Sequence, residues 1–343
     1  MMRTVLLLCA ALCAAAPAVA QTASPPDDPA QIRQQLERIR PKDFPQRPLE
    51  LVVAYPAGGG MDLTARILAK YLEKYIERPV VVANRAGAAG LIGHAHLATE
   101  AEPDGHTIGV VASNFWQDSM FRAEGKWSYE SMQPIAFVNY DPVTWIVSTK
   151  GPFKDKTLQD VVAAARANPG AVRVAASTST STAFVVEQVQ AITGTTFLPV
   201  LYQGGRQALT DLLGGHIDLS YGYLGEYRSQ MQAGQIQPIA VTSTERVPAL
   251  PDTPTFNEVL DTQDIVWDAF RFVVVPKGTP PERVRWLEAA FNAALADPGL
   301  AAEYDKLGAT VDRRLDSAEK VAAEVKRRAD KERAYFLKTG RLK

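Results

Sequence analysis

Residues 49–72 read LELVVAYPAGGGMDLTARILAKYL, an apolar run followed by three glycines and then a helical pattern. The run ending at Tyr55 predicts a buried strand, and apolar residues spaced three and four apart predict a helix over 62–76. Glycine loses more conformational freedom on folding than any other residue, so Gly58, Gly59 and Gly60 need a physical reason. Either the turn requires unusual backbone angles, or another group must approach its backbone closely.

The order of strand, loop and helix recurs along the chain. Alternating strands and helices are typical of parallel sheets with right-handed crossovers. The pattern predicts two parallel α/β units separated by an irregular stretch at 124–157, and a later strand, FRFVVVP, that returns to the first unit. We therefore predict an α/β fold of two domains with a ligand cleft between them, joined by two crossing segments. Domain 1 comprises residues 47–142 and 266–343, and domain 2 comprises residues 143–265.

The N-terminus has the pattern of a secretory signal peptide. Arg3 precedes an apolar core at 5–16, and the small residues at 18–20 predict cleavage after Ala20. This predicts a soluble protein exported to the periplasm. Residues 21–46 are rich in proline and charge, and we interpret them as an N-terminal arm packed on the surface or as a linker, with a short helix at about 30–39.

Composition and motifs exclude several classes of protein. Cys9 and Cys13 both lie in the predicted signal peptide, so we expect no disulfide, catalytic thiol or cysteine-ligated metal. The net charge is −1, without the basic excess of a nucleic-acid-binding protein. No G-x-G-x-x-G, G-x-x-x-x-G-K-[ST] or G-x-S-x-G motif occurs, and His94 and His96 would lie on different faces of a helix. We expect no cofactor, no metal and no catalytic residues.

The candidate binding residues follow predicted strands. In open α/β sheets, ligands bind beyond the carboxyl ends of the strands. The loops at 56–62 (PAGGGMD) and 176–182 (ASTSTST) both open a helix, whose free N–H groups and dipole favour an anion by about 0.3–1 kcal/mol. The loop QGG at 203–205 repeats this order, although each loop alone could be only a turn or a cap. The predicted ligand-binding residues are Tyr55, Ala57, Gly58, Gly59, Gly60, Asp62, Ser113, Ser177, Thr178, Thr180, Ser181, Thr182, Gln203, Gly204, Tyr221 and Arg271.

Two further features bear on the type of ligand. Several aromatic residues follow or flank strand ends and would favour a flat carboxylate if they line the cleft, or else belong to the core. These residues are Phe115, Trp116, Tyr221, Tyr223 and Phe270. Arg271 could bind a second carboxylate through two hydrogen bonds, or form a surface ion pair.

Six segments together resemble one known family. They are YPAGGGMDLTARILAKYL, NRAGAAGLIG, PDGHTIGVV, YQGGRQALTDLLGGHIDL, IAVTSTERVPALPDTPTFNE and VVVPKGTPPERV, in this order. They resemble the substrate-binding proteins of tripartite tricarboxylate transporters, the Bug or TctC family, from residue 47 to the end. The resemblance implies a type II periplasmic-binding-protein fold, a small carboxylate ligand and a membrane permease as partner. It also implies that the loops at 56–62 and 177–182 hold the carboxylate, partly through water.

We therefore predict a periplasmic solute-binding protein, not an enzyme. It would act as a monomer, capture a di- or tricarboxylate or an aromatic carboxylate between its domains, and deliver it to a permease. Two alternatives stay open. The protein could present its ligand to a membrane sensor kinase, or it could be an exported α/β hydrolase.

Overall fold

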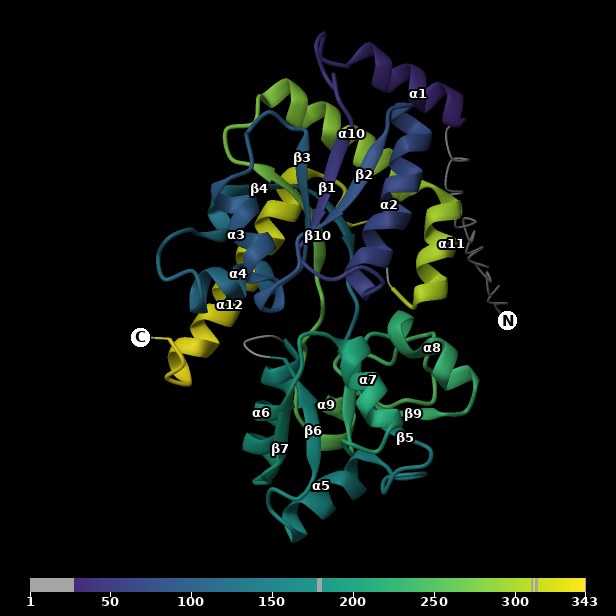
Figure 1. The fold of residues 1–343 in the computed structure, drawn as a ribbon, viewed down its shortest axis with the longest axis vertical. Helices are drawn as coiled ribbons and strands as arrows, with labels where there is room; N and C mark the ends of the chain where they lie inside the picture. The colour runs from purple at the N-terminus through teal and green to yellow at the C-terminus, as the bar shows by residue number, and fades with distance from the viewer. Residues whose placement is uncertain (1–27, 178–180, 310, 312–313, 343) are drawn as a thin grey trace, which may run out of the picture.

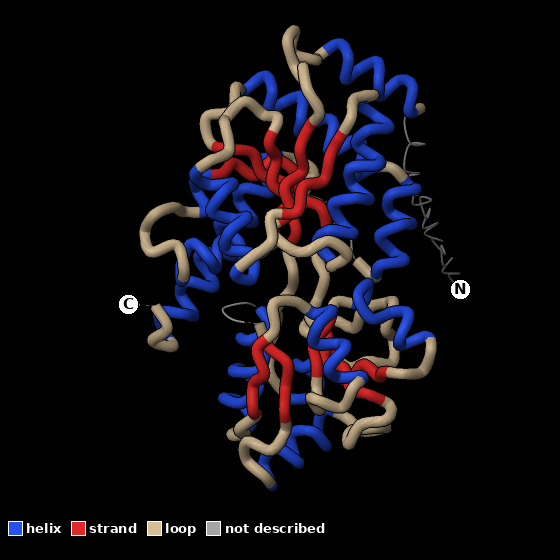
Figure 2. Tube along the Cα trace, viewed as in Figure 1, coloured by secondary structure: helices blue, strands red, loops and turns tan. Residues whose placement is uncertain are grey.

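The computed structural model describes residues 28–177, 181–309, 311 and 314–342. They form two lobes, one above the other in Figures 1 and 2. The first lobe contains a five-stranded sheet, and the second lobe contains a three-stranded and a two-stranded sheet. The predicted signal peptide lies outside the described residues. None of the helices within the described ranges has the length and apolarity needed to cross a membrane.

The first lobe is a sheet with helices on both faces. Its strand order is β2-β1-β3-β10-β4, in which β1 (Leu49–Val53) pairs in parallel with β2 (Val80–Asn84) and β3 (Thr107–Val111). The returning strand β10 (Arg271–Pro276) runs antiparallel to both β3 and β4 (Met132–Asn139). One face packs against α2 (Gly60–Ile76), α10 (Pro281–Ala296) and α11 (Pro298–Leu307). The other packs against α3 (Leu91–Thr99), α4 (Asn114–Phe121) and α12 (Ala318–Lys338).

The second lobe has two smaller sheets around one core. Strand β5 (Thr144–Ser148) lies between β8 (Ser220–Gly222) and β9 (Ile236–Val241) and is antiparallel to both. Strands β6 (Arg173–Ala176) and β7 (Leu198–Leu201) form a parallel pair. The helices of this lobe are α5 (Leu158–Ala167), α6 (Ser181–Thr193), α7 (Gly205–Leu213), α8 (Leu224–Gln232) and α9 (Phe256–Leu260).

Two expectations about the strands are wrong. The stretch at 124–157 is not irregular, since it contains both β4 and β5, and the second unit is not parallel throughout because β5 is antiparallel to its neighbours. Pro134 inside β4 weakens the strand pattern, and β4 tolerates it because this strand lies at the edge of its sheet.

The chain crosses between the lobes twice, as predicted. The crossing segments lie side by side and are joined by an isolated β-bridge between Pro142 and Asp268. The amide of Val143 donates to the carbonyl of Trp267 (3.3 Å), and the amide of Ala269 donates to that of Asp141 (2.9 Å). These paired segments form the hinge. We retain the boundaries at 142/143 and 265/266 as a proposal.

The two ends of the described chain pack on the lobes differently. Helix α1 (Pro29–Arg38) packs on the first lobe, where the Trp286 indole donates to the carbonyl of Leu36 (3.0 Å), so the described part of the arm packs on the surface of this lobe. Helix α12 contacts both lobes. Val321 and Val325 enter a core cluster of the first lobe, whereas Phe336 enters the core of the second.

Candidate functional site

A cavity of about 390 Å³ lies between the lobes, within the size range of small-molecule sites. It lies at the ends of strands from both lobes and beside the N-termini of α2, α4, α6, α7 and α8. Twelve of the sixteen predicted residues line it: Tyr55, Ala57, Gly59, Gly60, Ser113, Ser177, Ser181, Thr182, Gln203, Gly204, Tyr221 and Arg271. Thr178 and Thr180 lie outside the described residues.

Gly58 and Asp62 are not among the residues that line this cavity. The buried carboxylate of Asp62 accepts hydrogen bonds from the amide of Gly58 (2.8 Å), from Arg66 Nε (2.9 Å) and from Asn84 Nδ2 (3.0 Å). Burial acts to raise the pKa of Asp62, but these hydrogen bonds outweigh burial and hold the pKa below its ordinary value. Asp62 therefore stabilises the glycine loop. It also occupies the backbone amide of Gly58, which we predicted to bind the ligand.

The glycine loop is contacted by side chains of the second lobe. Arg206 Nη2 donates to the carbonyl of Gly58 (2.6 Å), and the amide of Gly60 donates to Glu226 Oε1 (3.3 Å). A third bond joins the amide of Ala89 to Gln203 Oε1 (3.1 Å). The amides of Gly58 and Gly60 are thus both occupied by groups of the protein itself.

These contacts explain the three glycines in part. Gly58 has φ of +81°, a conformation that side chains rarely adopt, and a Cβ there would lie 3.5 Å from Arg206 Nη2. A Cβ on Gly60 would lie 3.4 Å from Glu226 Oε1. The first reason expected from the sequence therefore applies at Gly58, which needs unusual angles. Other groups do approach the backbone of the loop, but a Cβ on Gly60 would be in ordinary contact with Glu226, so this approach does not by itself require glycine. The approaching groups are side chains of the second lobe.

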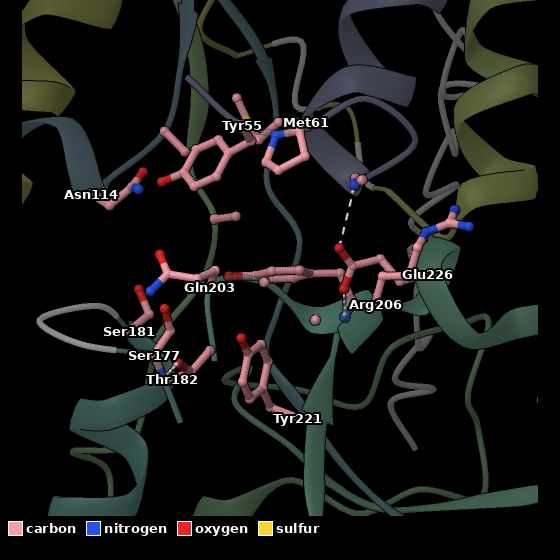
Figure 3. Close-up of a pocket in the computed structure, with 18 of the residues that line it drawn as sticks. Tyr55, Met61, Asn114, Ser177, Ser181, Thr182, Gln203, Arg206, Tyr221 and Glu226 are labelled. Atoms are coloured by element: carbon pink, nitrogen blue, oxygen red, sulfur yellow. Dashed lines mark hydrogen bonds between the residues drawn. The ribbon is translucent and has the colours of Figure 1, made fainter. Parts of the chain in front are cut away.

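Hydroxyl groups gather at the opposite side of the cavity. Ser177, Ser181 and Thr182 lie near the start of α6, and in Figure 3 they and Asn114 lie on one side, with Arg206 and Glu226 on the other. The amide of Ser177 donates to the Thr182 hydroxyl oxygen (3.0 Å). This bond holds the loop against its helix, so the first amide of the loop is a structural group.

Three tyrosines supply neutral hydroxyls and flat surfaces. Tyr55, Tyr221 and Tyr223 line the cavity. Burial, chiefly, raises the pKa of each phenol, and the nearby Asp118 carboxylate adds to this at Tyr55. They therefore remain protonated at neutral pH. The other aromatics considered, Phe115, Trp116 and Phe270, belong to a core cluster of the first lobe.

Arg271 forms an ion pair at the hinge. Both of its terminal nitrogens lie 3.2 Å from Asp141 Oδ2, and Nη1 also lies 3.0 Å from Asn139 Oδ1. Because the Arg271 residue is only 2% exposed, the surface ion pair considered for it is wrong. The guanidinium has partners of its own beside the cavity.

Ten lining residues are absent from the predicted binding set: Pro56, Met61, Ala112, Asn114, Gly205, Arg206, Gln207, Tyr223, Glu226 and Ala269. Pro56, Met61 and Gly205 nevertheless lie within the predicted loops, and Tyr223 is one of the aromatics that we considered for the cleft. Several directly adjoin predicted positions, such as Asn114 after Ser113 and Arg206 after the QGG loop, so a wider window around each strand end would have included them. Glu226 had no such signal, because it lies inside the amphipathic pattern of α8.

Two α/β lobes joined by two crossings, with a cavity between them, are typical of the periplasmic-binding-protein fold. The chain belongs to the tripartite tricarboxylate transporter receptor family, TctC, whose model matches residues 64–332. It is 33% identical over 267 residues to a UPF0065 protein encoded in the tcbD-tcbE intergenic region of Pseudomonas sp. strain P51, covering 77% of this chain and 79% of that protein.

Solved structures agree with this assignment. The periplasmic binding protein BugD has a TM-score of 0.79 at 30% identity, over 87% of this chain and 99% of BugD. The structure of R. palustris Rpa4515 with adipate has a TM-score of 0.77 at 23% identity, over 87% and 99% of the two chains, and shares the fold. The family resemblance and the fold class predicted from the sequence are confirmed.

Proposed function

We propose that this protein is a periplasmic receptor that captures a small organic carboxylate between its lobes and delivers it to a tripartite tricarboxylate transporter permease. The observation that carries this proposal is the cavity between the lobes, which combines hydroxyl groups at the start of α6 with phenols from both lobes. Membership of a transporter receptor family supports the role in transport.

The cavity can hold an anion by hydrogen bonds from neutral groups. Ser181 and Thr182 lie in the first turn of α6, where the helix dipole favours negative charge by about 0.3–1 kcal/mol. Asn114 and Tyr55 face them from the first lobe (Figure 3). A carboxylate at this place would contact both lobes, so binding would stabilise the closed arrangement.

A calorimetric screen tests the proposal. We expect one or more aliphatic or aromatic carboxylates to bind the mature protein saturably, while the corresponding primary amides, which carry no charge, bind at least tenfold more weakly. Ser181→Ala should weaken carboxylate binding by about tenfold, because a hydrogen bond to a charged group contributes about 1.5–3 kcal/mol. Ser119→Ala is a matched control, since its hydroxyl donates to the carbonyl of Trp116 within α4. Equal affinity for acids and amides would contradict the proposal.

The two alternative functions, an exported hydrolase and a sensor subunit, predict different results once a ligand is known. A hydrolase would convert an ester of the bound acid into product, whereas a receptor would leave it unchanged. Cells that lack the protein should lose uptake of the acid, and normal uptake with a lost transcriptional response would instead indicate a sensor subunit.

A further inference from the structure

Glu226 places a carboxylate in the wall of a cavity that we propose for carboxylates. It lies in the first turn of α8, where its Oε2 accepts from the amide of the N-cap residue Tyr223 (3.4 Å). Its Oε1 accepts from the amide of Gly60 at the N-terminus of α2, in the other lobe. The contact with Tyr223 is sufficient to cap α8. The contact with Gly60 has no role within the second lobe, because it joins the two lobes.

The backbone leaves room for this carboxylate. A Cβ on Gly205 would lie 2.4 Å from Glu226 Oε2, so the carboxylate would have to move, whereas a Cβ on Gly60 would lie at an ordinary contact distance of 3.4 Å from Oε1. Glycines of both lobes therefore flank the carboxylate. At the N-terminus of α2, where the helix dipole favours an anion, the protein supplies a carboxyl group of its own. Burial raises the pKa of Glu226, against the hydrogen bonds from Tyr223 and Gly60 and the charge of Arg271, so the group is fully ionised only at raised pH.

The positive groups nearby have other partners. Arg271 is held by Asp141 and Asn139, and Arg206 donates to the carbonyl of Gly58. The Arg206 side chain is also exposed, so solvent screens its charge. A ligand group that reached this end of the cavity would therefore meet the Glu226 carboxyl group, with Arg271 paired to Asp141 and the charge of Arg206 screened by solvent.

We propose that Glu226 fills the anion position at the N-terminus of α2 and thereby restricts the ligand to one carboxylate, held at the Ser181 side of the cavity. This inference rests on the proposed function and narrows its ligand class to monocarboxylates. A second carboxylate at the α2 end would lie beside Glu226 in a largely apolar cavity, where like charges disfavour each other strongly. A methyl group, a ring or a hydroxyl would meet no such repulsion.

Hexanoate and adipate test this directly, because they differ only in a second carboxylate at the far end of one six-carbon chain. We expect calorimetry at pH 8, which favours the ionised form of Glu226, to show the wild-type protein binding hexanoate at least tenfold more tightly than adipate. Glu226→Gln removes the charge and keeps an acceptor oxygen for Gly60, so it should reduce this preference at least fivefold by tightening adipate binding. Where the screen yields a different monocarboxylate, that acid and its ω-carboxy derivative are compared in the same way.

Glu258→Gln is the matched control, because Glu258 accepts from the amide of its N-cap residue at the same position of α9 without lining the cavity. It should retain the wild-type preference. Adipate binding as tightly as hexanoate in the wild-type protein would overturn the inference even if Glu226→Gln failed to fold. An unchanged preference in Glu226→Gln would overturn it too, while leaving the proposed function intact. Failure of all carboxylates to bind would instead overturn the proposed function.

Discussion

Gly93 controls how closely α3 lies on the ends of β1 and β2 in the first lobe. A Cβ at this position would lie 2.6 Å from the Cα of Ala54 and 2.7 Å from the carbonyl oxygen of Arg85. Both atoms belong to the backbone, Ala54 just after β1 and Arg85 just after β2, so they cannot move without shifting the ends of these strands. Strand β1 leads into the glycine loop. We expect Gly93→Ala to lower the free energy of unfolding by about 1–3 kcal/mol, because the overpacking outweighs alanine's better helix propensity.

Urea denaturation checks this prediction. Gly151→Ala is the control, since its Cβ would lie 3.4 Å from Ser148, close to ordinary contact. We expect this control to change stability by less than about 0.5 kcal/mol. Equal unfolding midpoints for the two variants would contradict the close packing of α3 on β1.

At the same scale, the glycine loop shows what sequence can and cannot reveal. The run at 58–60 correctly indicated a special turn and a close approach to its backbone. The approaching groups could not be predicted, because Arg206 and Glu226 lie far away in the sequence and belong to ordinary helical patterns. Only the closed arrangement of the lobes brings them to the loop.

Among the elements, α12 carries a titratable group that links stability to pH. Glu332 Oε2 accepts from the Trp116 indole and from Gln117 Nε2, both at 2.9 Å, and so ties α12 to α4. Burial raises the pKa of Glu332 to about 7, although the two hydrogen bonds act in the opposite direction. The folded protein therefore binds a proton here that the unfolded chain releases at lower pH.

The sign of the pH effect follows from this raised pKa. Stability from the protonated form is fully present below the unfolded pKa of about 4.5 and is lost as pH rises to about 7. Glu332→Gln keeps an acceptor but does not ionise. As the pH rises from 4.5 to 8, its free energy of unfolding should therefore increase by about 1–3 kcal/mol relative to that of the wild-type protein. Thermal unfolding across this range measures the difference.

Glu324→Gln gives a control of opposite sign on the same helix. A hydrogen bond from Arg327 lowers the pKa of Glu324, so its carboxylate stabilises the fold above the unfolded pKa. This variant should therefore lose stability relative to the wild-type protein as pH rises from 4 to 7. The same pH trend in both variants would show that the effect does not come from Glu332.

The elements that were correctly predicted from the sequence share regular spacing of apolar residues and clear boundaries. Helix α2 and strands β1 to β3 have regular apolar spacing and clear loops at their ends. Strands β4 and β5 were missed because β4 contains a proline and β5 directly follows the hinge, so neither is bounded by a turn signal. The aromatic residues near strand ends were equally ambiguous, since the same pattern places Tyr221 in the cavity and Phe115 in the core.

For the whole molecule, the balance between open and closed lobes should govern affinity. A bond away from the cavity joins Arg228 Nη1 on α8 to the carbonyl of Lys306 at the end of α11 (2.8 Å), and thus joins the second lobe to the first. This contact exists only when the lobes are together. The apparent affinity of a ligand that binds only the closed form is proportional to the fraction of the protein that is closed.

Arg228→Ala should therefore weaken binding of a carboxylate that it does not touch. We expect a loss of affinity of about two- to fivefold, corresponding to one hydrogen bond of about 0.5–1 kcal/mol, and a larger radius of gyration for the free protein in small-angle scattering. Arg246→Ala is the control, because Arg246 donates to the carbonyl of Pro251 within the second lobe. Weaker binding with an unchanged radius of gyration would mean that Arg228 acts by some route other than lobe closure, whereas equal losses in both variants would indicate a nonspecific effect of removing a surface charge.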